Sequence, residues 1–387
     1  MSADPATSPP ATSAPPPAAA QAPGDGKPPL MWGFVAIAVP VMGLAVGGAA
    51  LIGESKNALG SGLIALLTVV AALATPRETP WRAATLIGGA TFLMLLLANA
   101  TIGIPVLAGL SMFAVAFLGA MIGGAGQALS VAGIFVSMAY LLPAATGIAK
   151  DLSFPKAVEL GLVGLGAAFI AIAVITAVRA IKGGTGEEKE AAGEGTPAAD
   201  EPGEPGSAEA APSAAAQFRA ALSLHNQTFR YALRRAVALG IAMGIYAATG
   251  NHNVFWIMLT IFIVLQPDRA SSWHKALSRS VGVMIGAIIV AGLGQFLPSE
   301  AIIGLAIVVL LVGFAWYRRS YTVFAAGLSF TVVAIFGASD GSFADWAALR
   351  IADTLVGAVI ALLVGYLVLP DPWWRREQEP KVTPDSS

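Results

Sequence analysis

The stretch ALSRSVGVMIGAIIVAGLGQFL at 276–297 contains an apolar run long enough to cross a lipid bilayer, which takes about 20 helical residues. Gly282 and Gly286 stand four residues apart in it. This spacing lets two helices approach closely in lipid, where no hydrophobic force drives their association. Arg279 precedes the apolar run. The stretch predicts a membrane-spanning helix that begins after a cation and packs tightly on a neighbour.

The composition of the whole chain is also strongly apolar. Its 387 residues are 56% hydrophobic and 12% charged, with a mean hydropathy of +0.74. The charged share is about half that of a soluble domain. The net charge of −1 provides no basic field for nucleic acid, and the absence of Cys excludes a disulfide framework and a thiolate nucleophile. An integral membrane protein without a nucleic-acid partner is predicted.

Twelve apolar runs divide into two sets of six. An acidic linker at 183–217 separates the sets, a Pro- and Ala-rich tail at 1–29 precedes them, and a polar tail at 371–387 follows. The tail at 1–29 and the linker have too few large apolar side chains to form a core, so we expect a disordered tail and a flexible cytoplasmic linker. We expect an all-α polytopic fold of about twelve transmembrane helices in two pseudo-symmetric six-helix halves, residues 30–182 and 218–370. The expected spans are 31–52, 58–75, 83–99, 104–122, 128–148, 157–181, 232–249, 254–266, 280–297, 301–316, 321–338 and 346–369.

The distribution of basic residues predicts the orientation. Lys and Arg in short loops collect on the cytoplasmic side of a membrane. If all twelve runs cross and the N-terminus lies inside, all but four of the 22 basic residues fall on the inner side. The run 254–266 is short, but without it the basic loops on either side would face opposite compartments. We therefore expect a multi-pass protein of the bacterial cytoplasmic membrane, with both termini in the cytoplasm.

One motif recurs in four runs, in the order Arg, six residues, Gly-Ala. Three copies keep the arginine, and the fourth has Glu159 in its place. The copies open the third, ninth, twelfth and sixth helices, as expected if a unit of inverted three-helix repeats had been duplicated. The frequent Gly-Ala pairs of a Gly- and Ala-rich chain are the alternative explanation. The copies are RAATLIGGA at 82–90, RSVGVMIGA at 279–287, RIADTLVGA at 350–358 and ELGLVGLGA at 159–167.

Two further features predict how the helices are held. Trp81 stands directly before Arg82 and Trp273 six residues before Arg279, and both are expected to anchor the chain at the inner membrane interface. Four Gly-x-x-x-Gly pairs are expected to pack helices together. They are Gly43 with Gly47, Gly119 with Gly123, Gly240 with Gly244, and Gly282 with Gly286.

The second half contains an ordered series of segments over 228–370: YALRRAVALGIAMGIYAATG, VFWIMLTIFIVLQP, ALSRSVGVMIGA, RRSYTVFAAGLSFT and RIADTLVGAVIALLVGYLVLP. The series resembles the fusaric acid resistance (FUSC) membrane domain of the aromatic acid exporters, which is similar to plant malate channels. The matching positions are Arg234, Trp256, Gln266, Pro267, Arg279, Gly282, Gly286, Tyr321, Arg350, Asp353, Thr354 and Gly357.

The resemblance implies export of weak organic acids, typically aromatic carboxylates, often with a periplasmic adaptor. This chain departs from the family in its short acidic linker, where the exporters have a larger folded region. The sequence therefore leaves open whether an adaptor protein is a partner. Glu159 departs from the expected arginine. A passive organic-anion channel and a non-transport membrane scaffold for envelope assembly are the alternative functions.

Cationic groups along a path attract carboxylates. Arg82, Arg234 and Arg279 on the inner side and Arg350 on the outer side are the candidates, although positive-inside topology alone also explains the inner three. Trp256 and Gln266 complete the candidate substrate path. Tyr246, Phe255 and Phe330 are further aromatic side chains for stacking on a ring.

Asp353 and Glu159 are the proton-coupling candidates, because carboxylates within a membrane are costly unless they have a function. Glu159 and Arg350 occupy equivalent positions in the repeats, and we expect them to approach each other across the axis between the halves. The alternative is that both reach the outer interface separately.

An enzyme is not expected. The three His residues, His225, His252 and His274, have no metal-ligand spacing, and no Walker motif follows a strand. No cofactor or metal is predicted. The expected partners are the lipid bilayer and a small organic anion, and the sequence leaves a homo-oligomer open.

Overall fold

The computed structural model describes residues 30–53, isolated positions between 62 and 72, and the ranges 80–124, 127–145, 148–183, 222–223 and 226–369. Helices are the sole regular secondary structure in these ranges, and nine of them are long and apolar enough to cross a membrane. The all-α polytopic fold is therefore confirmed. The predicted tails at 1–29 and 371–387 lie outside the described residues, as do most of the span 58–75 and all of the linker 183–217 except Gly183.

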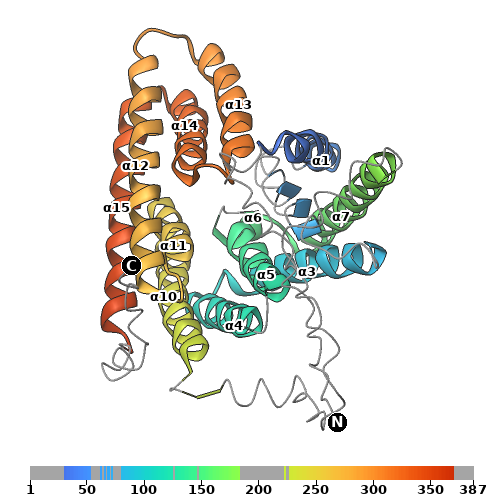
Figure 1. Ribbon diagram of the computed structural model, residues 1–387, viewed down its shortest axis with the longest axis vertical. Coiled ribbons are helices and arrows are strands. Elements are labelled where there is room, and N and C mark those ends of the chain that lie inside the picture. The colour runs from blue at the N-terminus through green and yellow to red at the C-terminus, as the bar shows by residue number, and fades with distance from the viewer. Residues whose placement is uncertain are drawn as a thin grey trace, which may run out of the picture.

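The first half contains six described helices (Figure 1). Each begins or ends close to an expected span, and the short α6 fills the turn before the last of them. They are α1 (Trp32–Leu51), α3 (Pro80–Thr101), α4 (Pro105–Gly123), α5 (Gln127–Ala145), α6 (Ile148–Asp151) and α7 (Phe154–Gly183).

The second half also contains six described helices, and each corresponds to one expected span. α11 has 13 residues. At 1.5 Å per residue it is about 20 Å long, which is shorter than the hydrocarbon core of about 30 Å. The six are α10 (Gln227–Thr249), α11 (His252–Val264), α12 (Arg269–Leu293), α13 (Ser299–Trp316), α14 (Tyr321–Asp340) and α15 (Phe343–Leu367).

Two motif arginines do not begin their helices, contrary to the expectation from the repeats. α12 starts at Arg269 because Asp268 caps it, accepting hydrogen bonds from the backbone N–H groups of Ala270 and Ser271. Hydrogen bonds from the Ser271 side chain and backbone lower the pKa of the Asp268 carboxyl. Arg279 is therefore about 15 Å along α12, at 1.5 Å per residue. Arg350 is likewise inside α15, which begins at Phe343.

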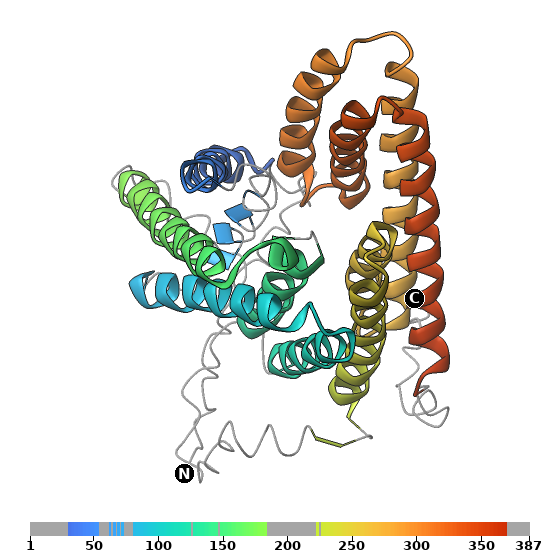
Figure 2. The ribbon, with the colours of Figure 1, turned by 180° about the vertical axis from the view of Figure 1, so that it is seen from behind.

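The helices of the two halves pack in the same order. In the first half α3 packs on α5 and α7, and α4 packs on α5; in the second half α12 packs on α14 and α15, and α13 packs on α14. The order agrees with a duplicated six-helix unit. The helix axes of the two halves point in different directions. α12 and α15 run along the length of the molecule, whereas α3 and α4 cross it (Figures 1 and 2).

The halves meet at two pairs of helices that correspond under the repeat. The more extensive contact is between α4 and α10, where Gly109 and Gly240 face each other: a Cβ on either would come within 2.9 Å of the other's carbonyl oxygen. The smaller contact is between α1 and α13, where the Met31 N–H donates to the Ala315 carbonyl at 2.8 Å. Glycine is needed at the α4–α10 crossing because the backbones approach so closely.

Three of the four predicted Gly-x-x-x-Gly pairs lie at helix contacts. A Cβ on Gly282 would come within 2.5 Å of the Thr322 carbonyl oxygen, and one on Gly286 would overlap the Ala326 carbonyl oxygen. The pairs at 119/123 and 240/244 also face neighbouring backbones or side chains. The pair at 43/47 is different, because a Cβ at either position meets nothing within 4 Å.

Candidate functional site

Three arginines from three different helices surround the short helix α11. Arg235 of α10, Arg279 of α12 and Arg350 of α15 are each 4% exposed or less. Each guanidinium contacts a different residue of α11. In the same order, these residues are Phe262, Thr260 and Trp256. Three buried guanidinium groups therefore lie around one short helix, where buried charge is costly.

Arg350 lies over an aromatic ring and makes no hydrogen bond to any described residue. Its Cζ is 3.8 Å from the centre of the Trp256 ring, and its Nε and Nη1 are buried without an acceptor. Trp256 is in turn flanked by Phe255, at a ring-centre distance of 4.5 Å, and by the edge-on ring of Phe336. A desolvated cation–π contact contributes about 2 kcal/mol, which offsets only part of the cost of burying the charge.

Arg279 has hydrogen-bond partners for only part of its guanidinium. Its Nε donates to Thr260 Oγ1 at 3.2 Å and its Nη1 donates to the Tyr321 hydroxyl at 3.4 Å. Its Nη2 is buried, and no described residue accepts a hydrogen bond from it. Thr260 is one helical turn from Trp256 and donates to its carbonyl at 2.9 Å. Arg279 and Arg350 thus approach the same turn of α11, where their charges repel each other.

Asp353 and Thr354 follow Arg350 along α15 and are also buried. Asp353 Oδ2 and Thr354 Oγ1 have no hydrogen-bond partner in the described ranges, and Asp353 forms no ion pair within 4.0 Å there. Asp353 and Arg350 nevertheless attract each other as opposite charges three residues apart on one helix. We call Trp256, Arg279, Arg350, Asp353 and Thr354 the arginine–aspartate cluster.

The cluster has the chemistry of an anion site. The cluster contains two guanidinium groups and a single carboxylate, so one positive charge is left over, together with N–H groups that have no acceptor among the described residues. Guanidinium groups bind carboxylates strongly, often through two parallel hydrogen bonds. The described residues contain no group of three His, Asp or Glu side chains that could bind a metal ion. A carboxylate that bridges Arg279 and Arg350 would satisfy the charge and the N–H groups together.

Two candidates from the sequence have structural contacts instead of places in the cluster. Arg234 donates to the carbonyl oxygens of Gly365 at 3.1 Å and Leu369 at 2.9 Å, at the C-terminal end of α15. Gln266 donates through its side chain to the Ile263 carbonyl, and its backbone N–H bonds to Ser272 Oγ in the turn between α11 and α12. Arg234 therefore caps the C-terminal end of α15, and Gln266 stabilises the turn between α11 and α12.

The two candidates of the first half lie at the surface. Arg82 is exposed near the start of α3. Glu159 is exposed and pairs with Lys156 at 2.8 Å, one turn away on α7. The expected approach of Glu159 to Arg350 is not found, because Arg350 is buried against Trp256. Lys156 compensates the charge of Glu159, and the Trp256 ring contacts Arg350.

Arg235 is not among the candidates expected from the sequence. Its Cζ lies 3.9 Å from the Phe262 ring centre, and its Nη1 donates to the Tyr231 hydroxyl at 2.5 Å. Neighbouring residues on a helix point about 100° apart, so Arg234 faces α15 while Arg235 faces α11. The two arginines are adjacent in one basic segment of α10. Only the position of α11 in the structure shows which of them contacts it.

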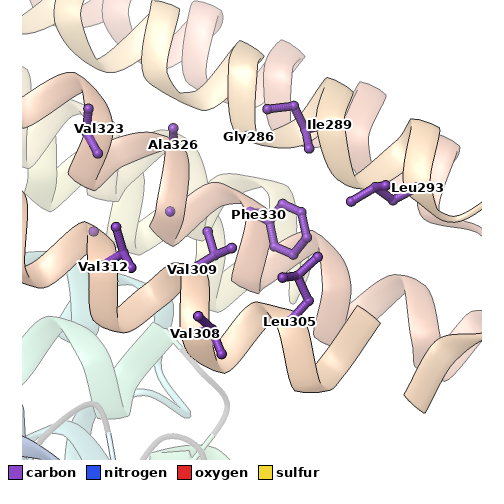
Figure 3. Close-up of a pocket in the computed structure, with 12 residues that line it drawn as sticks. Gly286, Ile289, Leu293, Leu305, Val308, Val309, Val312, Val323, Ala326 and Phe330 are labelled. Carbon is purple, nitrogen blue, oxygen red and sulfur yellow. The ribbon is translucent and has the colours of Figure 1, made fainter. Parts of the chain in front are cut away.

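A separate groove of about 270 Å³ lies between α12, α13 and α14 (Figure 3). The Phe330 ring lies between Gly286 and Ile289 of α12 and Val309 and Leu305 of α13. Every lining side chain is apolar. The groove suits a hydrocarbon group and offers nothing to a carboxylate, so it is not the anion site.

The fold defines a polytopic helical membrane protein whose second half buries a cluster of cationic side chains. Residues 241–364, which include the whole cluster, match the model of the family described as "Fusaric acid resistance protein-like". The resemblance noted in the sequence is confirmed for this segment. The match begins after Arg234 and does not extend into the first half.

Curated relatives align with about two fifths of this chain. Inner membrane protein YccS of Escherichia coli is 28% identical over 155 residues, which are 40% of this chain and 21% of that protein. The uncharacterized protein ORF2 of Neisseria gonorrhoeae is 28% identical over 156 residues, which are 40% and 37% of the two chains. The alignments therefore span well under half of each relative. No solved structure matches this chain.

The inner-membrane relative and the apolar helices support a multi-pass inner membrane protein.

Proposed function

We propose that this protein exports small organic acids, in particular aromatic carboxylates, from the cytoplasm across the inner membrane. The observation that carries the proposal is the pair of buried guanidinium groups, Arg279 and Arg350, whose remaining N–H atoms have no acceptor in the described structure. A charge buried in a membrane protein without a partner is costly unless a ligand compensates it. An organic anion is a ligand of the right sign.

The cluster also offers an aromatic surface beside the cations. Trp256 lies under the Arg350 guanidinium, and Phe255 adjoins its ring. An aromatic carboxylate would place its charged group between Arg279 and Arg350 and its ring against this surface, where stacking contributes about 0.5–1.5 kcal/mol. The negative interior potential of a bacterial cell would favour outward movement of the anion.

Asp353 is the proposed proton-coupling residue, and its position gives the sign of the coupling. An ionised Asp353 competes with a substrate carboxylate for Arg350, whereas a protonated Asp353 leaves both guanidinium groups to the substrate. Protonation of Asp353 should therefore raise the affinity for the anion, and ionisation of Asp353 should lower it and favour release. Asp353→Asn, which mimics the protonated form, should remove the pH dependence of anion binding.

The test is efflux of labelled benzoate and substituted benzoates from proteoliposomes containing the full chain. Arg350→Gln should abolish efflux, and Glu159→Gln, at the repeat-equivalent exposed position, should leave it unchanged. Efflux against the electrochemical gradient of benzoate, driven by an imposed proton gradient, supports an exporter. Downhill flux alone would indicate the passive channel, and no flux of any tested acid would overturn the transport proposal in favour of a scaffold.

A further inference from the structure

A third cation stands near the start of α12, one turn from Arg279. Lys275 and Arg279 are four residues apart and share a face of the helix. The Lys275 ammonium lies 4.1 Å from the centre of the Tyr321 ring and has no hydrogen bond or ion pair to any residue that the structure describes. Lys275 is half-buried, so its charge is partly removed from water without a compensating carboxylate.

Tyr321 joins the two cations. Its ring lies against Lys275, and its hydroxyl accepts a hydrogen bond from Arg279 Nη1 at 3.4 Å. Tyr321 is the first residue of α14, so it stands at the positive end of that helix dipole. Arg279 Nη2 is buried there without a described acceptor. Three independent sources of positive potential therefore meet around one tyrosine.

An aromatic wall adjoins this tyrosine. The Tyr317 ring is edge-on to Tyr321 at 6.4 Å, and the Phe324 ring is 5.9 Å from Tyr321. Tyr317 is 46% exposed, so the wall is open to solvent or the membrane interface at one side. The location combines a reachable cation, exposed aromatic surface and a hydrogen-bond contact with the buried cluster.

We propose that Lys275 and Tyr321 form an entry site for the anion, which precedes the arginine–aspartate cluster on the transport path. Lys275 attracts the carboxylate from the side where α12 begins, expected to be the cytoplasm. As the carboxylate moves one helical turn from Lys275 to Arg279, Arg279 Nη1 exchanges its hydrogen bond to the Tyr321 hydroxyl for one to the carboxylate. Lys275 and Tyr321 are positioning residues of the path, and this inference rests on the proposed organic-anion function.

The two residues should affect different steps. Lys275→Gln removes the attracting charge and should raise the benzoate concentration for half-maximal efflux about tenfold, with little change in the maximal rate. Tyr321→Phe keeps the ring under Lys275 and removes the hydroxyl. It should lower the maximal rate severalfold and leave the half-maximal concentration nearly unchanged.

Arg319→Gln is the matched control. Arg319 lies over the Trp316 ring at 5.2 Å, so it is also a cation on an aromatic face close to the start of α14. It makes no contact with Arg279 in the described structure. The control should behave as wild type; if it raises the half-maximal concentration as much as Lys275→Gln does, general surface charge explains the effect and the entry site is overturned.

Benzoate binding to the full chain in nanodiscs, followed by tryptophan fluorescence, separates this inference from the function on which it rests. If wild type binds benzoate but does not transport it, the export function fails, while weaker binding by Lys275→Gln than by Arg319→Gln still supports the entry site. If Lys275→Gln binds and transports as wild type does, the entry site is wrong and the export function stands. If wild type binds no benzoate, both proposals are overturned.

Discussion

The two halves repeat one motif, but only the second half buries it. Arg82 and Arg279 are equivalent in the repeat, yet Arg82 is exposed and Arg279 is 1% exposed. Glu159 and Arg350 are also equivalent, yet Glu159 makes a surface ion pair and Arg350 lies over Trp256. The two halves can therefore share an order of helices while the buried polar chemistry is concentrated in the second half.

The motif glycines differ in the same way. A Cβ on Gly357 would come within 2.7 Å of Thr260 Cβ, and one on Gly286 would overlap a backbone carbonyl. At the equivalent Gly89 and Gly166 a Cβ meets nothing within 4 Å. In the first half the close contact is at Gly88, one position earlier, so the helix presents a face rotated by about 100°. This rotation shows why a shared motif does not imply a shared contact.

The sharpest test of the difference is neutralisation of the equivalent arginines. Arg279→Gln should weaken benzoate binding and efflux by about thirtyfold or more, because loss of a buried charged partner costs about 2–5 kcal/mol. Arg82→Gln should change both by less than about twofold, because Arg82 is exposed near the start of α3. Efflux assays on the two variants compare the halves directly. Equal losses would mean that both halves contribute cations to the path.

Not every buried arginine of the second half should affect transport. Arg234→Gln removes two charge-assisted hydrogen bonds to the end of α15 and should destabilise the protein by about 2–3 kcal/mol. Its thermal midpoint in detergent should fall, while the benzoate affinity of the folded fraction should stay near that of wild type. A normal midpoint combined with lost affinity would place Arg234 in the anion site.

The glycines provide a stability test of the same comparison. Gly286→Ala should destabilise the protein by about 1–3 kcal/mol, because the new methyl group pushes α12 away from α14. Gly89→Ala should stabilise it by up to about 1 kcal/mol, because alanine favours helix and the site is open. Thermal midpoints of monodisperse protein in detergent measure both changes. A loss at Gly89 would show that the first half also packs through its motif glycine.

The smallest effect is expected at the Glu159–Lys156 pair. Exposed ion pairs contribute about 0.2–1 kcal/mol, so Glu159→Gln should lower stability by no more than this. The measurement is the thermal midpoint at low and high salt, and the small difference from wild type should vanish at high salt. A larger loss, insensitive to salt, would indicate that Glu159 has a buried partner.

Much of the fold could be predicted because apolar length is a local property of the sequence. Every expected span with a described counterpart is a helix, including 254–266, which appears as α11. The start of α12 was missed by about eleven residues. The segment from Arg269 to Arg279 is polar and was assigned to a loop, although Asp268 caps a helix there.

The candidate site was only partly predictable. Arg279, Arg350, Asp353 and Trp256 were selected, and the structure brings them together. Arg234 was selected and Arg235 was not, although Arg235 is the one that contacts α11 and Arg234 contacts the end of α15. Which of two adjacent arginines faces α11 depends on the rotation of α10, and the sequence of α10 alone does not fix that rotation.

The sequence by itself determined the class of protein, because a chain with so many long apolar runs and so few charges is stable only in a bilayer. It also located the motif that recurs in both halves. The tertiary structure decided which copies of that motif carry charge into the interior. Burial of Arg279 and Arg350 depends on the short helix α11, whose Thr260 and Trp256 lie where α12 and α15 converge. Contacts between distant segments create that environment, and no local pattern records them.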